Sequence, residues 1–142
     1  MSFMEIFMEK EVLERAEKWG ILAEKVIDSH KDLQWIPTMG VRIDYIESNK
    51  EKKASGNRTV YAQCKRIDEL HKLYCPYDFV IIFYLPNIGH MSEEQKMILL
   101  YHELLHIDYR ENKDGDFTYC CRPHDVEDFK KIIAEYGMDW AE

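Results

Sequence analysis

An apolar stretch that carries two histidines one helical turn apart constrains this chain more than any other feature. Between Ser92 and Asp108 the apolar side chains follow helical spacing: Met97, Ile98, Leu100, Tyr101, Leu104, Leu105 and Ile107. Ser92 followed by Gln95 is a capping-box signature, which predicts that the helix begins at Ser92, and we expect it to continue to about Asp108. Because the apolar residues surround most of the helix, we expect it to be buried and the fold to be built around it.

The polar residues of this helix form an HExxH pattern, His102-Glu103-Leu104-Leu105-His106. At about 100° per residue, His102 and His106 lie about 40° apart on one face, so their imidazoles can bind one metal ion. Glu103 lies about 100° round from His102, which suits a general base acting on a metal-bound water. Two histidines and a glutamate on a buried helix are costly without a compensating partner, and a metal ion supplies one. The alternative is a pair of hydrogen-bonded core histidines that merely share this spacing.

A catalytic zinc takes three protein ligands and a water, so a third ligand is expected outside the helix. We expect His124, because a short turn and strand from Asp114 to Cys121 would bring the chain back alongside the helix. Glu127 is the rival, as in sites built from two histidines and a glutamate, and Cys120 or Cys121 is a further alternative.

Two aspartates near the motif are candidates for orienting a ligand imidazole through its other nitrogen. These are Asp108 and Asp125, although Asp125 could equally serve only as the cap of the last helix.

The rest of the sequence predicts an α+β fold in which helices and strands alternate along the chain. No repeat or Pro/Gly/Ser-rich linker divides the 142 residues, so we expect one domain, residues 1–142. Phe79 to Leu85 is continuously apolar and predicts an inner strand with helices behind it. The other expected elements are a long helix from Glu9 to His30, strands at Val41 to Ile46 and Thr59 to Cys64, a short helix at Ile67 to Leu73, an extended piece at Phe117 to Cys121, and a last helix from Asp125 to Tyr136, ending at Gly137.

Composition narrows the class of protein. The net charge of −8 argues against a chain built mainly to bind nucleic acid, although basic residues gather between Arg42 and Arg66. We interpret that stretch as a solvated hairpin tip, with a docking patch as the alternative. The longest apolar run is too short for the ~20 residues of a membrane helix, and no secretory signal is visible. We therefore expect a soluble cytoplasmic protein whose cysteines are reduced.

The motif and its surroundings resemble a known family. The run Tyr101 to Ile107, followed by Arg122-Pro123-His124-Asp125-Val126-Glu127-Asp128-Phe129, resembles the phage metallopeptidases, small zincin-like proteins of phages and prophages, and is distantly similar to SprT-like peptidases. The resemblance implies a zincin-like minimal metallopeptidase fold, with a small β-sheet packed against an N-terminal helix and the HExxH helix. It implies zinc held by His102, His106 and His124, with Glu103 as the catalytic acid/base, and, for a phage-encoded protein, a place in the host cytoplasm. SprT-like proteins often add a cysteine zinc ribbon, which this sequence lacks.

The leading hypothesis is a zinc-dependent peptide-bond hydrolase acting on a peptide or protein, with no membrane or nucleic-acid partner. The alternative is a non-catalytic zinc-binding regulatory or interaction module, whose site a fourth protein ligand such as Cys120 or Cys121 would close. A third hypothesis is a hydrolase of non-peptide amides or of nucleic-acid-bound protein that uses the basic stretch.

Overall fold

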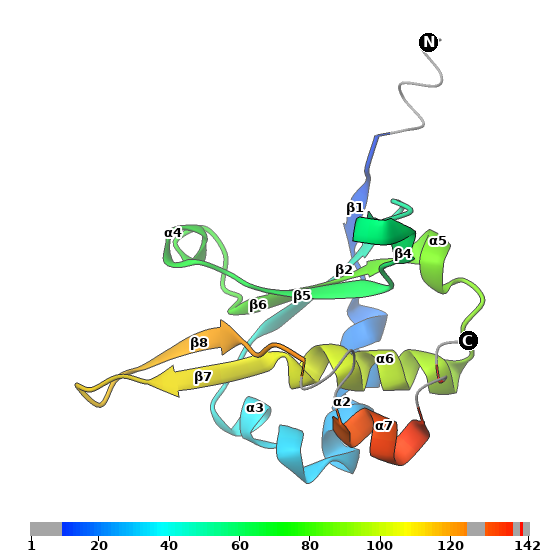
Figure 1. The fold of residues 1–142 in the computed structure, drawn as a ribbon. Coiled ribbons are helices and arrows are strands. Elements are labelled where there is room, and N and C mark those ends of the chain that lie inside the picture. The colour runs from blue at the N-terminus through cyan, green and yellow to red at the C-terminus, as the bar shows by residue number, and fades with distance from the viewer. Residues whose placement is uncertain (1–9, 125–129, 138–139, 141–142) are drawn as a thin grey trace.

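The protein has an α+β architecture in which a small mixed sheet lies against a layer of helices (Figure 1). The computed structural model describes residues 10–124, 130–137 and 140. None of the helices formed by these residues combines the length and apolar content needed to cross a membrane.

The main sheet has four strands in the order β1-β2-β6-β5. Strand β1 (Leu13–Arg15) is antiparallel to β2 (Ile43–Ser48), β2 is parallel to β6 (Phe79–Tyr84), and β6 is antiparallel to β5 (Ala62–Arg66). Strand β6 is therefore an inner strand, as its apolar run predicted, and β5 forms an edge. The odd-numbered side chains of β6, Phe79, Ile81 and Phe83, are fully buried, whereas Val80 and Ile82 on the opposite face are half-buried.

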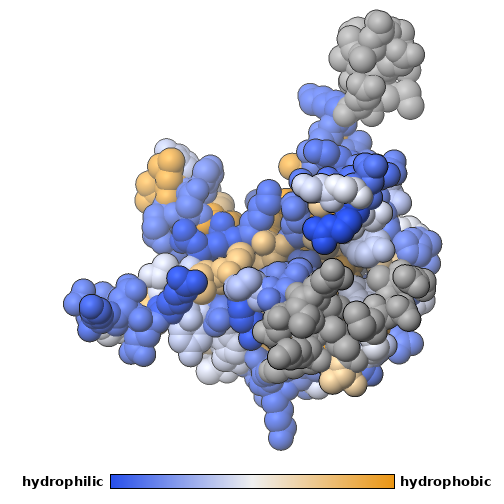
Figure 2. All heavy atoms as spheres, viewed as in Figure 1, coloured by the Kyte–Doolittle hydropathy of each residue, from blue (hydrophilic) through white to orange (hydrophobic). Residues whose placement is uncertain are grey.

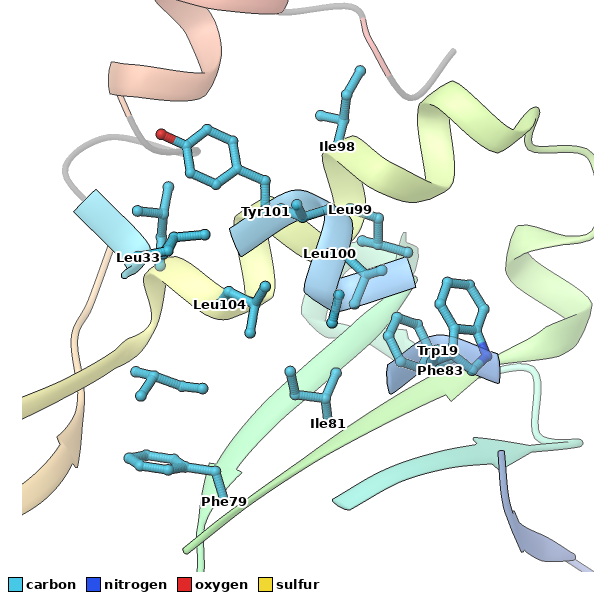
Figure 3. Packing of buried hydrophobic residues seen from close by; sticks show 14 of the residues in the cluster. Trp19, Leu33, Phe79, Ile81, Phe83, Ile98, Leu99, Leu100, Tyr101 and Leu104 are labelled. Carbon is cyan, nitrogen blue, oxygen red and sulfur yellow. The ribbon is translucent and has the colours of Figure 1, made fainter. Parts of the chain in front are cut away.

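Two long helices cover the buried face of the sheet, α2 (Glu17–Ser29) and α6 (Glu93–Leu105). The predicted capping box is confirmed, because the Ser92 hydroxyl accepts from the Gln95 N–H at 3.2 Å and the Gln95 side chain accepts from the Ser92 N–H at 2.8 Å. Figure 3 shows Leu100 and Leu104 of α6 pointing toward Ile81 of β6. The same figure shows Trp19 of α2 stacked on Phe83, with ring centroids 3.8 Å apart. The histidine-bearing helix is thus anchored by core packing.

Shorter elements complete the chain. A second hairpin, β7 (Ile107–Glu111) with β8 (Phe117–Cys121), extends from the end of α6 (Figure 1). The others are η1 (Lys31–Leu33), α3 (Trp35–Thr38), the small hairpin β3 (Lys53–Ala54) and β4 (Arg58–Thr59) with η2 (Ser55–Asn57) between them, α4 (Glu69–Lys72), α5 (Leu85–Ile88) and α7 (Lys130–Tyr136).

Several predicted boundaries are wrong. The first helix begins at Glu17, because the preceding Leu13–Arg15 pairs with β2 instead of continuing the helical pattern. Helix α6 ends at Leu105 and not at Asp108, because Ile107 already pairs with Cys121 in the β7–β8 hairpin. The start of the last helix at Asp125 lies outside the described residues, but its end before Gly137, which has φ +82°, is confirmed.

Candidate metal centre

Three imidazoles converge at the C-terminal end of α6. His102 lies in the last turn of the helix, His106 caps its end, and His124 follows β8. The Nε2 atom of His124 lies 2.9 Å from the Nε2 atoms of both His102 and His106. In a tetrahedral zinc site with Zn–N bonds of 2.0–2.1 Å, ligand nitrogens are about 3.3 Å apart. The two distances are about 0.4 Å shorter than this spacing, and the ligand atoms of all three histidines lie within 4.8 Å of one another, so one metal ion could bind to all three.

The β7–β8 hairpin places the third imidazole. Its base is closed by the pairing of Ile107 with Cys121 and by a 2.6 Å hydrogen bond from the Arg122 N–H to the His106 carbonyl. The chain leaves the hairpin beside the end of the helix from which it departed. His124 consequently returns to the two helical histidines after a short turn and strand, as the spacing predicted.

A main-chain carbonyl orients one imidazole. His106 Nδ1 lies 2.6 Å from the carbonyl oxygen of Arg122. A carbonyl only accepts, so Nδ1 carries the proton and Nε2 keeps its lone pair directed at the centre. Burial, together with the neighbouring His102 and His124, lowers the pKa of His106 to about 4. The imidazole is therefore neutral at neutral pH, which is the form that binds a metal ion.

A buried carboxylate stands next to the three imidazoles. Glu103 is only 3% exposed, which is rare for a glutamate, and its Oε1 lies 3.9 Å from His102 Nε2. Helical geometry turns its side chain away from the common face of the histidines while keeping it in the same cleft. This position would allow the carboxylate to exchange protons with a molecule beside a metal ion bound by the histidines, without itself occupying a ligand position.

The three histidines and Glu103 form one wall of a cleft of about 270 Å³. The opposite wall is the sheet edge, consisting of Val60 and residues 62–65 of β5. Figure 2 shows apolar surface within the hollow between the sheet and the helix layer, surrounded by polar surface. A larger hollow of about 380 Å³ lies between α2 and β2 and contains none of the three histidines.

The register of β5 determines which of its main-chain groups face outward. The Ile67 N–H donates to the Asp78 carbonyl, and the Tyr84 N–H donates to the Tyr61 carbonyl. Residues 61 and 67 therefore form hydrogen-bonded pairs with residues 84 and 78, which belong to β6 or directly precede it. Hydrogen-bonded and non-hydrogen-bonded pairs alternate in an antiparallel ladder, so residues 63 and 65 also bond to β6. The N–H and C=O groups of Ala62, Cys64 and Arg66 therefore point away from β6. The first two of these residues line the cleft.

The structure brings together His102, Glu103, His106 and His124. Among the described residues the only group of potential metal ligands is the three histidines, so Cys120 and Cys121 do not join it. Cys121 instead points its sulfur at the carbonyl oxygen of Cys64, 3.6 Å away. The rival ligand Glu127 lies outside the described residues.

Of the two aspartates proposed to orient a ligand, Asp108 accepts a hydrogen bond from the Tyr109 N–H, and Asp125 lies outside the described residues. The orienting group that the structure shows, the Arg122 carbonyl, was missed. A main-chain carbonyl is present at every position, so no residue type signals it. The family resemblance implied a sheet edge beside the cleft that can pair with a peptide, and the structure assigns this edge to β5.

A helix that carries two imidazoles and a buried glutamate, with a third imidazole returning from a hairpin, is an arrangement that can hold a metal ion beside a carboxylate. The chain matches the family model described as "Putative phage metallopeptidase" over residues 12–142, and it belongs to this family. The family name implies a metal ion and points to a peptidase. No curated protein and no solved structure matches the chain, so the assignment rests on the family model.

Proposed function

We propose that this protein is a zincin-like peptidase that uses zinc to hydrolyse a peptide bond. The observation that supports this most directly is the position of His124 Nε2, 2.9 Å from both HExxH imidazole nitrogens, in the cleft that contains buried Glu103. Three imidazole ligands leave one position of a tetrahedral zinc for water or substrate, which is the coordination of catalytic zinc sites. Nickel, copper and iron also accept imidazole, so the identity of the metal is part of the proposal.

When bound, zinc lowers the pKa of a coordinated water to about 7 and polarises a carbonyl oxygen. The protein's own contribution to the chemistry is a proton shuttle and a fixed set of ligands. Glu103 accepts the proton of the attacking water and returns it to the leaving nitrogen. The Arg122 carbonyl keeps His106 in the tautomer whose Nε2 is free of a proton.

The substrate is proposed to be an extended peptide segment lying between β5 and α6. The outward main-chain groups of Ala62 and Cys64 can pair with such a segment as an added strand. Main-chain pairing is tolerant of sequence, so this wall holds many peptides. A peptide paired with β5 would have its scissile bond facing Glu103 on the opposite wall of the cleft.

The proposal is tested by metal content and peptide hydrolysis measured on the same samples. We expect one zinc per wild-type chain, loss of zinc in His124→Ala, and retention of zinc in the control His71→Ala, whose imidazole contacts Asp68 away from the cleft. We expect Glu103→Gln to keep its zinc and to lose about 10²–10⁴-fold in hydrolysis rate, the usual effect of losing a general base.

Wild-type turnover in Glu103→Gln would contradict the mechanism. One zinc per chain in His124→Ala would mean that another residue is the third ligand, and Glu127 would be the first to examine. Stoichiometric zinc without hydrolysis of any peptide would favour the non-catalytic binding module.

A further inference from the structure

Two cysteines meet at the margin of the cleft, outside the group of histidines. Cys64 lies in the edge strand β5 and lines the cleft, and Cys121 is the last residue of β8. The Cys121 sulfur lies 3.6 Å from the Cys64 carbonyl oxygen, so the Cys121 side chain is in contact with Cys64. Both cysteines are free thiols. We propose that Cys64 and Cys121 form a redox-active dithiol, which a peroxide oxidises to a disulfide that ties β5 to β8.

The geometry supports this pairing over the others that the cysteines allow. The two residues are 57 positions apart in the sequence, and their strands belong to different sheets, so only tertiary packing brings them together. Because the Cys121 sulfur already contacts the Cys64 main chain, rotation of the two side chains is the movement needed to bring the sulfurs to the S–S bond length of about 2.05 Å. Cys120 precedes Cys121 on a strand, so its side chain projects to the opposite face.

The surroundings of the two sulfurs differ, and this difference indicates which thiol reacts with the oxidant first. Interaction with the Cys64 thiol, and then with the Arg66 main-chain N–H, lowers the pKa of Cys121 to about 7. The same contact and burial raise the pKa of Cys64. Cys121 is also exposed, whereas Cys64 is half-buried. Cys121 is therefore the thiol that meets the oxidant, and Cys64 is the thiol that resolves the product.

The reaction balances with a peroxide as the only oxidant. The Cys121 sulfur attacks one peroxide oxygen, an S–O bond forms, the O–O bond breaks, and the leaving oxygen departs as water with the thiol proton. The Cys64 sulfur then attacks the sulfenic acid, the S–S bond forms, and the S–O bond breaks, releasing a second water that takes the Cys64 proton. The two thiols lose two electrons, and hydrogen peroxide gains them.

The disulfide would act on the wall of the cleft that is proposed to hold substrate. It fixes the outward-facing Cys64 against β8, where its carbonyl can no longer accept from an added strand. In the reduced protein the Cys121 thiol makes only a long, weak contact with this carbonyl, which a peptide N–H can displace. Oxidation is thus expected to reduce peptide hydrolysis without removing a metal ligand. This consequence rests on the proposed function, whereas formation of the disulfide does not.

The test treats the zinc-loaded full chain with hydrogen peroxide, blocks the remaining thiols, and maps disulfides by mass spectrometry of non-reduced peptides. We expect one intramolecular Cys64–Cys121 link that a reductant reverses. The link should persist in the matched controls Cys120→Ser and Cys75→Ser, and it should be absent from Cys64→Ser and Cys121→Ser. Circular dichroism of each variant establishes that it is folded, and Cys64→Ala and Cys121→Ala serve as second variants.

Several results would overturn the proposal. They are a link through Cys120, a disulfide between two chains, or oxidation of Cys121 to sulfinic acid in the wild type with no link to Cys64. A peptidase assay on the same samples separates the two proposals. If the disulfide forms but no sample hydrolyses peptide, the proposed peptidase function is wrong and the dithiol proposal is supported. If hydrolysis is normal and no link forms, the dithiol fails alone.

Discussion

Helix α6 and the β7–β8 hairpin both supply ligands to the candidate metal centre, but they are held in place by different forces. The helix is buried along most of its length, with Leu100 and Leu104 fully enclosed between the sheet and α2. The hairpin is mostly exposed: its own ladder of main-chain hydrogen bonds joins its two strands, and Ile107 and Tyr119 attach it to the core. Two ligands are therefore fixed by the hydrophobic core, and the third depends on a small, locally stabilised element. The centre should consequently lose its geometry at the hairpin before the helix unfolds.

The largest expected effect is a loss of folding stability when the core packing of helix α6 is disturbed. Leu104→Ala removes a side chain with 0% exposure and leaves a cavity beneath the HExxH turn, which should lower the free energy of unfolding by about 2–5 kcal/mol. Urea denaturation followed by circular dichroism measures this. The matched control is Leu73→Ala, at a leucine that is 77% exposed, for which the change should stay within about 0.5 kcal/mol. Equal losses in the two variants would mean that α6 does not lie in the core.

The next effect concerns the hairpin. Gly115 has φ +84° in the β7–β8 turn and open space where a Cβ would lie, so Gly115→Ala adds backbone strain of about 1–2 kcal/mol without a clash. We expect faster amide hydrogen exchange in β7 and β8, unchanged exchange in α6, and zinc binding weakened by up to about tenfold.

Gly89→Ala is the control for this substitution, because Gly89 has helical φ and ψ and its added Cβ would make an ordinary 3.6 Å contact. Accelerated exchange that spreads equally through α6 would show that hairpin and helix unfold together, and the comparison between them would fail.

The smallest expected effect on stability comes from the cap at the start of helix α6. Ser92→Ala removes the hydroxyl that accepts from the Gln95 N–H, while the main-chain N–H of residue 92 can still donate to the Gln95 side chain, and it should cost about 1 kcal/mol of stability. Ser92→Asp keeps an acceptor at the cap and should restore most of the loss. Thermal denaturation compares the two variants, with zinc content expected to remain unchanged because the cap lies three turns from the histidines. A zinc loss in Ser92→Ala would show that the ligands depend on the whole helix.

Much of α6 could be predicted from residues alone. The Ser92–Gln95 pair gave its first residue, and the apolar spacing indicated its burial, because both are local properties of the sequence. Its last residue was predicted three positions too far, since the pairing of Ile107 with Cys121 competes with helical continuation. The first helix was overextended for the same reason, because Leu13–Arg15 fits a helical pattern until β2 offers it a partner.

The sequence by itself determined the convergence of His102 and His106 and the offset of Glu103, because residues four and one apart have fixed angles on a helix. The tertiary structure decided the approach of His124, the orientation of His106 by the Arg122 carbonyl, and the outward direction of the main chain at Ala62 and Cys64. It also decided the meeting of Cys64 and Cys121. The physical reason is that main-chain groups carry no residue identity, and contacts between strands of different sheets depend on packing that no local spacing encodes.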